Sequence, residues 1–401
     1  MVGRNGLDLR AAGEGESPQD HRSDLRGGFD RERGRRLADG DGMIEAPPDP
    51  VSVPDAQATR SVPVGTLLDL FAGAGGMTAG FVAAGFDPVF AVEIDAAAAR
   101  TYATNFGAHV HAGPIEDVSQ FPITEVIIGG PPCQGFSPLG RDRDHGSRAT
   151  LNTLWKEYLR AVQQTRPKVF VIENVPEFLK SSQFLAFLSE FSTQEDLADY
   201  EVEYQVLNAA DYGVPQRRRR GIVIGSRVGA PIWPSKTHGP EAIPPMPYAT
   251  VRDALEGIPL EPTNAEMHWS RNPTQMSLDR YDAVPEGGNR FDLARNRPDL
   301  LPACWANKPT GTTDVFGRMW WDRPSFTIRT EFFKPEKGRY LHPTANRSIT
   351  HREAARLQSF ADDFVFTGSR IEIARQIGNA VPPRLAEAVA KAVLATLIQG
   401  H

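Results

Sequence analysis

The sequence predicts an α/β fold with a doubly wound, mostly parallel sheet and a second, smaller and irregular domain. Three observations lead to this prediction. Short apolar runs alternate with helix-like stretches through the first half of the chain, as in a parallel sheet covered on both faces. The alternation is lost between residues 226 and 322, where Pro, Gly, Asn and Trp are frequent, and this segment is expected to consist of small strands and loops. Regular patterns then return from residue 323 onward.

The predicted elements follow one another in a regular order. The apolar run TLLDLF at 66–71 predicts a first buried strand, and a Gly-rich turn leads from it into a helix that ends near Ala84. Thr350 and Glu353 are spaced as a capping box, which predicts that another helix begins there. Further strands are expected at 88–93, 125–130, 168–173, 200–207 and 220–225, and further helices at 95–106, 151–165, 178–191 and 383–398.

Length and composition set the domain organisation. A chain of 401 residues predicts two or three domains. Residues 1–60 are poor in large apolar side chains and predict a disordered tail, with Met43 as an alternative start. Residues 61–225 and 323–401 are then expected to form one α/β domain, which the smaller domain at 226–322 interrupts.

Charge, cysteine count and hydropathy exclude several classes of protein. With 44 Lys and Arg against 50 Asp and Glu, the net charge is −6 at pH 7, so binding to nucleic acid must depend on local basic patches. Two cysteines, Cys133 and Cys304, cannot form a disulfide scaffold or a zinc-ligand set, and we expect no metal. The sequence contains no run of about 18 apolar residues and no signal-peptide pattern, so we expect a cytoplasmic protein without a membrane span.

The turn after the first strand has the composition of a ligand-binding loop. Its sequence DLFAGAGG, at 69–76, lets the backbone turn tightly and brings free N–H groups of a helix N-terminus to a ligand. Glu93 ends the next strand about 20 residues later, where an acid binds ribose hydroxyls. Thr78 stands where a dinucleotide motif has its last glycine, which favours a nucleoside ligand such as S-adenosylmethionine. The glycines of the turn are Gly73, Gly75 and Gly76.

The segment GGPPCQGFS at 129–137 predicts a reactive cysteine. Two prolines stiffen the chain directly after the third strand, so Cys133 is expected on a rigid loop at the carboxyl end of the sheet. The polar neighbours Gln134 and Ser137 favour a nucleophilic thiolate over a small buried side chain. Cys304 has no such context and is interpreted as a structural residue.

Two further segments place polar side chains near the same crevice. Glu173 of ENVPEF lies at the carboxyl end of the fourth strand and would face the same crevice as Cys133. A carboxyl group there can protonate or hydrogen-bond a ring nitrogen. Asn379 of QIGNAVP precedes the last helix and could hydrogen-bond a ligand from a loop that the helix anchors.

The run QRRRRGIVIG at 216–225 puts four arginines before a buried strand. Alternate residues of an extended segment share a face, so Arg218 and Arg220 should point one way. Arg217 and Arg219 should then point the other way, toward phosphates.

Together these five segments resemble the bacterial type of DNA (cytosine-5)-methyltransferases. They occur in the family's order over 66–225 and 323–398, with the variable gap between them in the expected place. DLFAGAGG resembles the first motif of the family, PPCQGFS its nucleophile motif and ENVPEF its catalytic-acid motif. QRRRR resembles its Q-x-R-x-R motif and QIGNAVP its last motif.

The resemblance implies a Rossmann-like methyltransferase domain, a target-recognition domain at 226–322 and a set of site residues. Cys133 is the expected nucleophile and Glu173 the acid that engages the cytosine ring, with Arg218 and Arg220 as the flanking pair. In place of an acid that contacts the cofactor adenine, this chain has Pro114, so that contact would fall to Asp117 or to a backbone oxygen. The expected S-adenosylmethionine pocket contains Phe71, Gly73, Gly75, Gly76, Glu93, Pro132 and Asn379.

The implied reaction transfers a methyl group from S-adenosylmethionine to carbon 5 of cytosine in a specific sequence of double-stranded DNA. A covalent adduct with Cys133 would form on a base flipped out of the helix. We expect a monomer, nucleoid-associated when bound to DNA, with a separately encoded restriction endonuclease as a possible partner. The expected DNA contacts are the basic residues Arg217, Arg219, Arg271, Arg290, Arg295 and Arg297, whereas Trp305, Trp320 and Trp321 are expected to serve packing.

Three alternatives stay open at this point. A cytosine-5 methyltransferase acting on RNA would need the same catalytic set. A catalytically silent DNA-binding protein is disfavoured by the intact Cys133, Glu173 and Arg218 set. A nicotinamide oxidoreductase is disfavoured by Thr78.

Overall fold

The structure is a computed structural model that describes residues 63–132, 153–263, 265–306 and 313–400. All of these belong to one unit, which extends from residue 58 to residue 401. The tail expected at 1–60 and the loop that begins at Cys133, with Gln134 and Ser137, lie outside the described residues.

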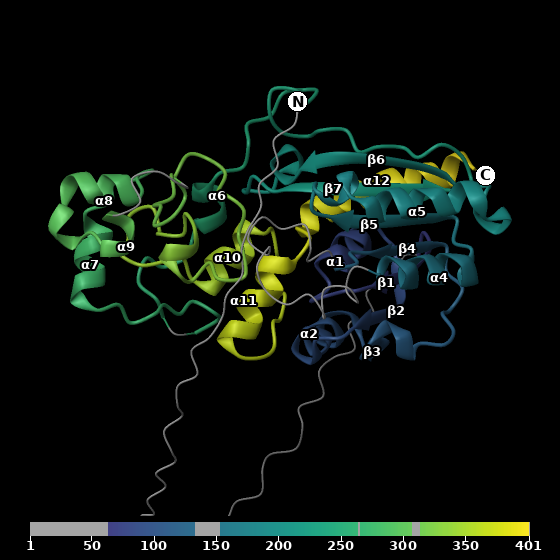
Figure 1. The fold of residues 1–401 in the computed structure, drawn as a ribbon, viewed down its shortest axis with the longest axis horizontal. Helices are drawn as coiled ribbons and strands as arrows, with labels where there is room; N and C mark the ends of the chain where they lie inside the picture. Colours follow the sequence, from purple (N-terminus) through teal and green to yellow (C-terminus); the bar gives the residue numbers. More distant parts are fainter. Residues whose placement is uncertain (1–62, 133–152, 264, 307–312, 401) are drawn as a thin grey trace, which may run out of the picture. The chain divides into compact units, whose positions relative to one another are not determined.

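A mixed seven-stranded sheet, seen on the right of Figure 1, has the strand order β3-β2-β1-β4-β5-β7-β6. The first five strands in chain order pair in parallel, and β7 lies antiparallel between β5 and β6. The chain first moves outward from β1 to β3 and then returns to place β4 on the other side of β1. Ligands bind at the carboxyl ends of strands where such a reversal occurs. The strands are β1 (Thr66–Leu70), β2 (Asp87–Glu93), β3 (Val110–Ala112), β4 (Val126–Gly129), β5 (Val169–Asn174), β6 (Glu201–Asn208) and β7 (Arg219–Ser226).

This architecture confirms the predicted fold class, and six of the strands overlap the predicted runs. β3 was not predicted, because three residues are too few to show an alternating pattern. The reversal of β7 was not predicted either, since the apolar pattern of a buried strand carries no information about its direction.

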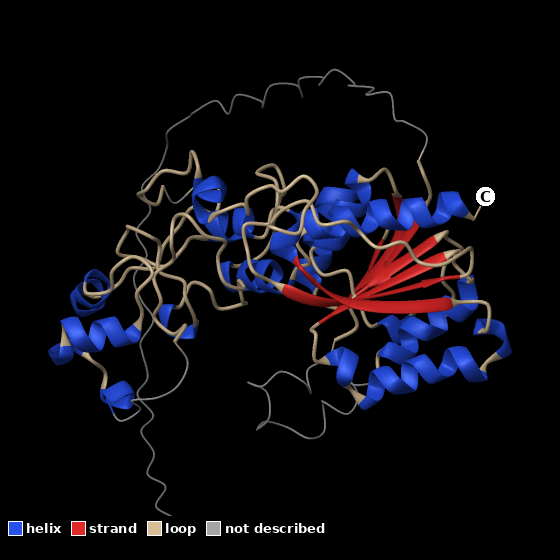
Figure 2. Cartoon of the chain, turned by 90° about the horizontal axis from the view of Figure 1, so that it is seen from above, coloured by secondary structure: helices blue, strands red, loops and turns tan. Residues whose placement is uncertain are grey.

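Helices lie on both faces of the sheet (Figure 2), and alternate side chains of the central strands pack against one layer or the other. Leu68 and Ile127 pack in one hydrophobic cluster with the inner sides of α4 and α5. Leu67 and Ile128 pack in a second cluster, on the other face, with α1 and α12. Both faces of the sheet are therefore covered, as the near-continuous apolar strands required. These helices are α1 (Gly76–Ala83), α4 (Trp155–Thr165), α5 (Ser182–Thr193) and α12 (Pro383–Gln399).

Short-range capping signals begin the helices near the predicted positions. The side chain of Asp95 accepts hydrogen bonds from the backbone N–H groups of Ala97 and Ala98 at the start of α2 (Ala96–Phe106). The predicted capping box of Thr350 and Glu353 is confirmed and begins α10 (His351–Leu357). A further capping box, on Ser369, begins α11 (Arg370–Asn379).

The described part of 226–322 consists of short helices and long loops, so the small strands predicted there were wrong. Pairing outside the seven-stranded sheet is limited, in this described part, to two isolated bridges, one between Gly239 and Met246 and one between Arg318 and Leu341. The hydrophobic cluster around Val251 is completed by Ile328 and Leu357, from beyond residue 322. Because this segment packs against residues far along the chain, its own sequence shows little of the hydrophobic periodicity from which helices and strands are predicted. The helices are α6 (Val251–Leu255), α7 (Gln275–Asp282), α8 (Arg290–Asn296) and α9 (Ala303–Ala306).

We predict that Gly80→Ala destabilises the fold where α1 crosses α12. A Cβ at position 80 would lie 2.5 Å from Ala386 Cβ and 2.5 Å from Pro383 O, so the two helices would have to separate. Overpacking of this kind costs about 1–3 kcal/mol of unfolding free energy. Urea denaturation followed by circular dichroism should show the loss, whereas Val82→Ala, on the exposed side of α1, should change stability little. Equal stability of Gly80→Ala and the wild type would contradict the close approach of the helices.

Candidate active site

A cavity of about 480 Å³ opens at the carboxyl ends of β1, β2, β4 and β5. Its volume lies within the range of small-molecule sites. The structure brings most of the predicted site residues together in its wall, although they come from segments up to about 300 residues apart. Those present are Phe71, Gly73, Gly76, Glu93, Pro132, Glu173, Arg218, Arg220 and Asn379.

Of the other predicted site residues, Gly75 is not among the lining residues. Cys133 lies outside the described residues, and Pro132 is the last described residue before it. Gly75 instead has a structural place at the start of α1, with a φ of 87°. The backbone there packs so closely on the Phe106 and Tyr102 rings that a Cβ would clash with both. The need for glycine at this position is therefore explained by packing.

The turn after β1 is closed onto the end of β2 by the carboxylate of Glu93. The backbone N–H of Gly73 donates to Glu93 Oε2 over 2.7 Å, and that of Asp95 donates to Oε1 over 2.7 Å. Burial raises the pKa of Glu93 above its usual value, although the two N–H donors act in the opposite direction. A carboxylate has about four acceptor sites, so Glu93 can still accept a hydrogen bond from a ligand hydroxyl.

An ion pair joins the ends of β5 and β7 inside the cavity. Arg220 Nε lies 2.7 Å from Glu173 Oε1, and both side chains are nearly buried. Next to Glu173, Asn174 Nδ2 donates to Pro131 O over 2.9 Å, which ties the end of β5 to the Pro-Pro segment after β4. The acid predicted for ring contact is thus held by an arginine and placed beside the segment that leads to Cys133.

Arg218 also reaches the cavity but has a different set of partners. It is 1% exposed, and its guanidinium donates to the backbone oxygens of Ile328 and Gly378. Burial and the charge of Arg220 lower its pKa well below the usual value. On the same segment, Gln216 Nε2 donates to Leu357 O, and Gln216 Oε1 accepts from the Ile328 N–H. This motif therefore joins the start of β7 to three places more than 100 residues later, at Ile328, Leu357 and Gly378.

Several lining residues were missed by sequence reasoning. Asp69 is one of them, and it lies within the apolar run of β1. A single acidic residue in an otherwise apolar buried strand could have indicated a functional role. Arg375 and Gln376 lie on α11, one turn before Asn379, and helical spacing could have indicated them. Within the described residues, the cavity wall includes neither Pro114 nor Asp117.

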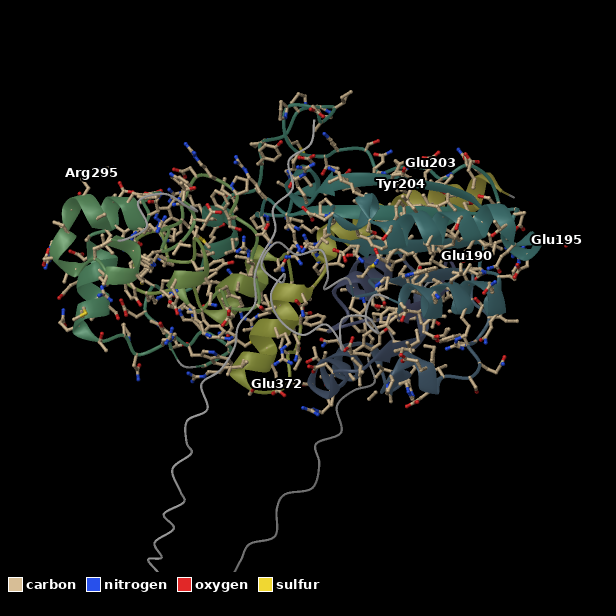
Figure 3. The ribbon with its side chains drawn as sticks, viewed as in Figure 1. Glu190, Glu195, Glu203, Tyr204, Arg295 and Glu372 are labelled. Carbon is tan, nitrogen blue, oxygen red and sulfur yellow. The ribbon has the colours of Figure 1, made fainter. Side chains whose placement is uncertain are left out.

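The basic residues expected to contact DNA differ in their surroundings. Arg290 is 7% exposed, so it is part of the core. Arg295 lies at the surface of α8 (Figure 3) and pairs with Asp292, and Arg297 pairs with Asp299. Arg217 and Arg219 are exposed, and no carboxylate pairs with them among the described residues. The same is true of Arg323 and Arg329, which the sequence did not single out.

The three tryptophans expected to serve packing do so. Trp305 packs edge-on against Phe316, and Trp321 packs against His342. Trp320 lies beneath the guanidinium of Arg339, which is 4.3 Å from its ring centre.

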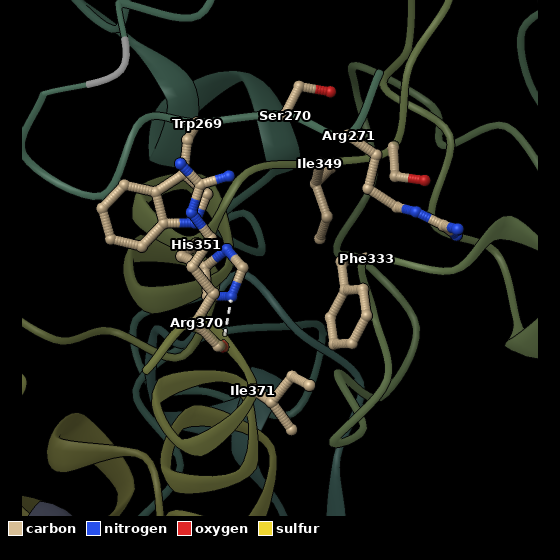
Figure 4. Close-up of a pocket in the computed structure, with 9 residues that line it drawn as sticks. Trp269, Ser270, Arg271, Phe333, Ile349, His351, Arg370 and Ile371 are labelled. Atoms are coloured by element: carbon tan, nitrogen blue, oxygen red, sulfur yellow. Dashed lines mark hydrogen bonds between the residues drawn. The ribbon is translucent and has the colours of Figure 1, made fainter. Parts of the chain in front are cut away.

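A second, smaller cavity of about 210 Å³ lies at the N-terminal end of α11 (Figure 4). Aromatic side chains dominate it, and the Arg370 guanidinium lies 4.9 Å from the centre of the Trp269 ring. Burial lowers the pKa of His351 to about 4, and its Nε2 donates to Arg370 O over 2.8 Å. Arg271 lines this cavity, so it lies apart from the predicted site residues.

A doubly wound sheet, a Gly-rich turn closed by an acid after β2, and an acid–arginine pair beside a Pro-Pro segment define an α/β methyltransferase. The chain belongs to the C-5 cytosine-specific DNA methylase family, which matches residues 65–395. It is therefore an enzyme that methylates carbon 5 of cytosine in DNA, and the family and fold imply S-adenosylmethionine-dependent catalysis. This membership decides against the nicotinamide oxidoreductase and the silent DNA-binding protein.

Curated relatives and solved structures agree with this assignment. Type II methyltransferase M1.HphI of Haemophilus parahaemolyticus is 37% identical over 343 residues, covering 82% of this chain and 86% of the relative. Type II methyltransferase M.NgoFVII of Neisseria gonorrhoeae is 34% identical, with the same coverage of both chains. A DNA modification methyltransferase encoded within a prophage (E. coli) superposes with a TM-score of 0.61 at 25% identity, over 83% of this chain and 99% of that chain.

More distant structures share the fold alone. The S. pombe Dnmt2 methyltransferase superposes with a TM-score of 0.56 at 16% identity, over 83% of this chain and 98% of that chain. Within the described residues, none of the helices is long and apolar enough to cross a membrane. No group of three or more acidic, histidine or cysteine side chains in this described part could hold a metal ion.

We predict that Arg218→Lys lowers the free energy of unfolding by about 1.5–3 kcal/mol, the usual contribution of a hydrogen bond to a charged group. A lysine cannot donate in the fixed fork that reaches both Ile328 O and Gly378 O. Arg219→Lys, the exposed neighbour in the same run, is the matched control and should be neutral. Chemical denaturation of both variants measures the difference, and equal midpoints would show that Arg218 does not join these segments.

Proposed function

We propose that the 480 Å³ cavity binds S-adenosylmethionine on its β1–β2 side and receives the flipped cytosine on its β4–β5 side. The observation that carries this proposal is the Glu173–Arg220 ion pair, which shares one cavity with the Glu93–Gly73 turn. Glu93 would accept hydrogen bonds from the ribose hydroxyls. The backbone around Phe71 and Gly73, together with Pro132 and Asn379, would complete the cofactor pocket.

On the other side of the cavity, Glu173 and Cys133 would act on the base. The Cys133 thiolate would add to carbon 6 of the ring, and Glu173 would hold or protonate N3 as electron density moves there. Carbon 5 then becomes a nucleophile, and the cofactor, when bound, supplies its electrophilic methyl group. Loss of the carbon-5 proton would expel the Cys133 thiolate. Arg220, through its contact with Glu173, is placed to hold the ring oxygen.

Arg218 would act as a positioning residue in this scheme. Its two bonds to backbone oxygens leave it little freedom to reach a ring, and they hold the start of β7 in place. Arg220 follows two residues later on the same face, so Arg218 would fix the direction from which Arg220 meets Glu173.

We further propose the domain roles and the route of DNA. Residues 61–225 and 323–401 would form the catalytic domain, and 226–322 would recognise the target sequence in duplex DNA. Phosphates would be contacted by the exposed arginines that have no carboxylate partner among the described residues, Arg217, Arg219, Arg323 and Arg329. Flipping the cytosine costs a few kcal/mol, which these contacts would offset.

The cellular role follows from the relatives. Both compared relatives are named type II methyltransferases, so we propose that this chain is a modification enzyme of a restriction-modification system. It would act as a cytoplasmic, nucleoid-associated monomer beside a separately encoded endonuclease. The family match to DNA methylases favours DNA over RNA as substrate. Bisulfite sequencing of DNA from cells that express the chain would report activity and target together.

We predict that Cys133→Ser abolishes methyl transfer and leaves DNA binding largely intact. Glu173→Gln should lower the rate by at least about 100-fold, the usual contribution of an acid–base group. Two matched controls, Cys304→Ser and Glu177→Gln, replace an exposed cysteine and the neighbouring acid of ENVPEF and should keep the activity. Transfer of labelled methyl groups to duplex DNA measures all four variants. Wild-type activity of Cys133→Ser would refute the nucleophile assignment.

We predict that replacing Arg217 and Arg219 by alanine weakens DNA binding, because fewer phosphates are then neutralised by the protein. The slope of log K against log salt concentration should become shallower by about 0.9 for each phosphate that no longer has an arginine beside it. Arg297→Ala is the control, because that guanidinium is already paired with Asp299. Fluorescence anisotropy at several salt concentrations measures the slopes. An unchanged slope for the double variant would show that Arg217 and Arg219 do not contact phosphates.

A further inference from the structure

Asp69 is a buried acid in the wall of the cavity that the reaction scheme above does not use. It lies near the end of β1 and is 1% exposed, yet it lines the same cavity as Glu93 and Glu173. The hydroxyl of Thr78, on α1, donates to its Oδ2. A carboxylate in this position is costly unless a positive charge approaches it.

The part of the chain that the structure describes supplies no such positive charge beside Asp69. Among the described residues, no lysine, arginine or histidine forms an ion pair with Asp69. The titratable groups that act on it are acids and phenols, namely Glu93 from β2, Tyr102 from α2 and Tyr158 from α4. Burial, and to a smaller extent Glu93, raise the pKa of Asp69 to about 7. The three arginines of the same wall have other partners, since Arg220 pairs with Glu173, Arg375 pairs with Asp95, and Arg218 donates to two backbone oxygens. Ionised Asp69 therefore has no basic partner among the described residues.

The strand order shows which part of a ligand would lie near Asp69. β1 lies between β2, which ends in Glu93, and β4, which neighbours β5 and its Glu173. In the proposed function the ribose binds at Glu93 and the reacting base at Glu173. The sulfur of the cofactor is bonded to a carbon of the ribose, and its methyl group would be transferred to the base. The sulfur would therefore lie between the two, near the end of β1 and Asp69.

We propose that Asp69 distinguishes the cationic sulfonium of S-adenosylmethionine from the neutral thioether left after transfer. This inference rests on the proposed function, because it takes the cavity to be the cofactor site. The ionised carboxylate attracts the sulfonium, and this attraction is strong in a site from which water is excluded. On transfer, the electron pair of the sulfur–methyl bond stays on sulfur, so the ligand loses its positive charge. The product lacks this attraction to Asp69, and is therefore bound less tightly than the cofactor by the amount that the attraction contributed.

The test compares two ligands that differ in charge near the sulfur position. S-Adenosylhomocysteine carries a neutral thioether, whereas sinefungin carries a protonated amine, and both keep the same adenosine and amino-acid groups. Isothermal titration calorimetry with the full chain gives the dissociation constant of each ligand at about pH 6 and about pH 8.5, on either side of the Asp69 pKa. Asp69 is protonated and neutral below that pKa, so its preference for the cation should grow as the pH rises.

For the wild type we divide the dissociation constant of S-adenosylhomocysteine by that of sinefungin. We expect this ratio to be about tenfold larger at the higher pH than at the lower pH. In Asp69→Asn this change with pH should disappear, because the amide keeps the shape and the bond from Thr78 but carries no charge. Asp363→Asn, an exposed acid outside the cavity wall, should behave as the wild type. A ratio in Asp69→Asn that changes with pH as in the wild type would overturn the inference.

A second measurement needs no variant. At about pH 7, where Asp69 is half protonated, a cationic ligand should displace its proton, so sinefungin binding releases protons and S-adenosylhomocysteine binding does not. Titrations in two buffers of different ionisation enthalpy measure this release. Equal proton release for both ligands would overturn the inference. Absence of binding by either ligand would instead refute the proposed cofactor site, so the two failures are distinguishable.

Discussion

The buried guanidinium of Arg218 is the contact on which the arrangement of this site depends. It joins the start of β7 to the backbone oxygens of Ile328 and Gly378, which belong to the part of the chain that follows the 226–322 segment. Gln216 adds bonds to Leu357 and Ile328 on the same side. These bonds join the chain before the 226–322 segment to the chain that follows it. Asn379 reaches the cavity because α11 is held at Gly378.

The cavity also has an uneven distribution of charge. On the β1–β2 side, Asp69 and Glu93 face the ligand space without a basic partner among the described residues. On the β5–β7 side, the acid Glu173 is balanced by Arg220 at 2.7 Å. This distribution supports our proposal that the cationic cofactor binds on the first side and the neutral base on the second. The two sides meet over β1 and β4, where the strand order reverses.

Much of the fold could be predicted because its signals are local. The run TLLDLF has the apolar character of a buried strand, and the capping box of Thr350 and Glu353 needs only three residues of spacing. The segment at 226–322 could not be predicted in this way. Its residue Val251 finds its core partners at Ile328 and Leu357, so no local pattern reports that packing.

Sequence by itself determined the class of sheet, the order of the motifs and the residue types that meet at its carboxyl edge. Tertiary structure alone decided how each of those residues is used. Arg218 and Arg220 share a face of one strand, yet the first is tied to backbone oxygens and the second to Glu173. Arg290 and Arg217 were both expected from the sequence to contact DNA, yet Arg290 is buried and Arg217 is exposed. The reason is that the burial of a side chain and its charged partners depend on which residues lie near it in the folded structure, and these residues are often distant along the chain.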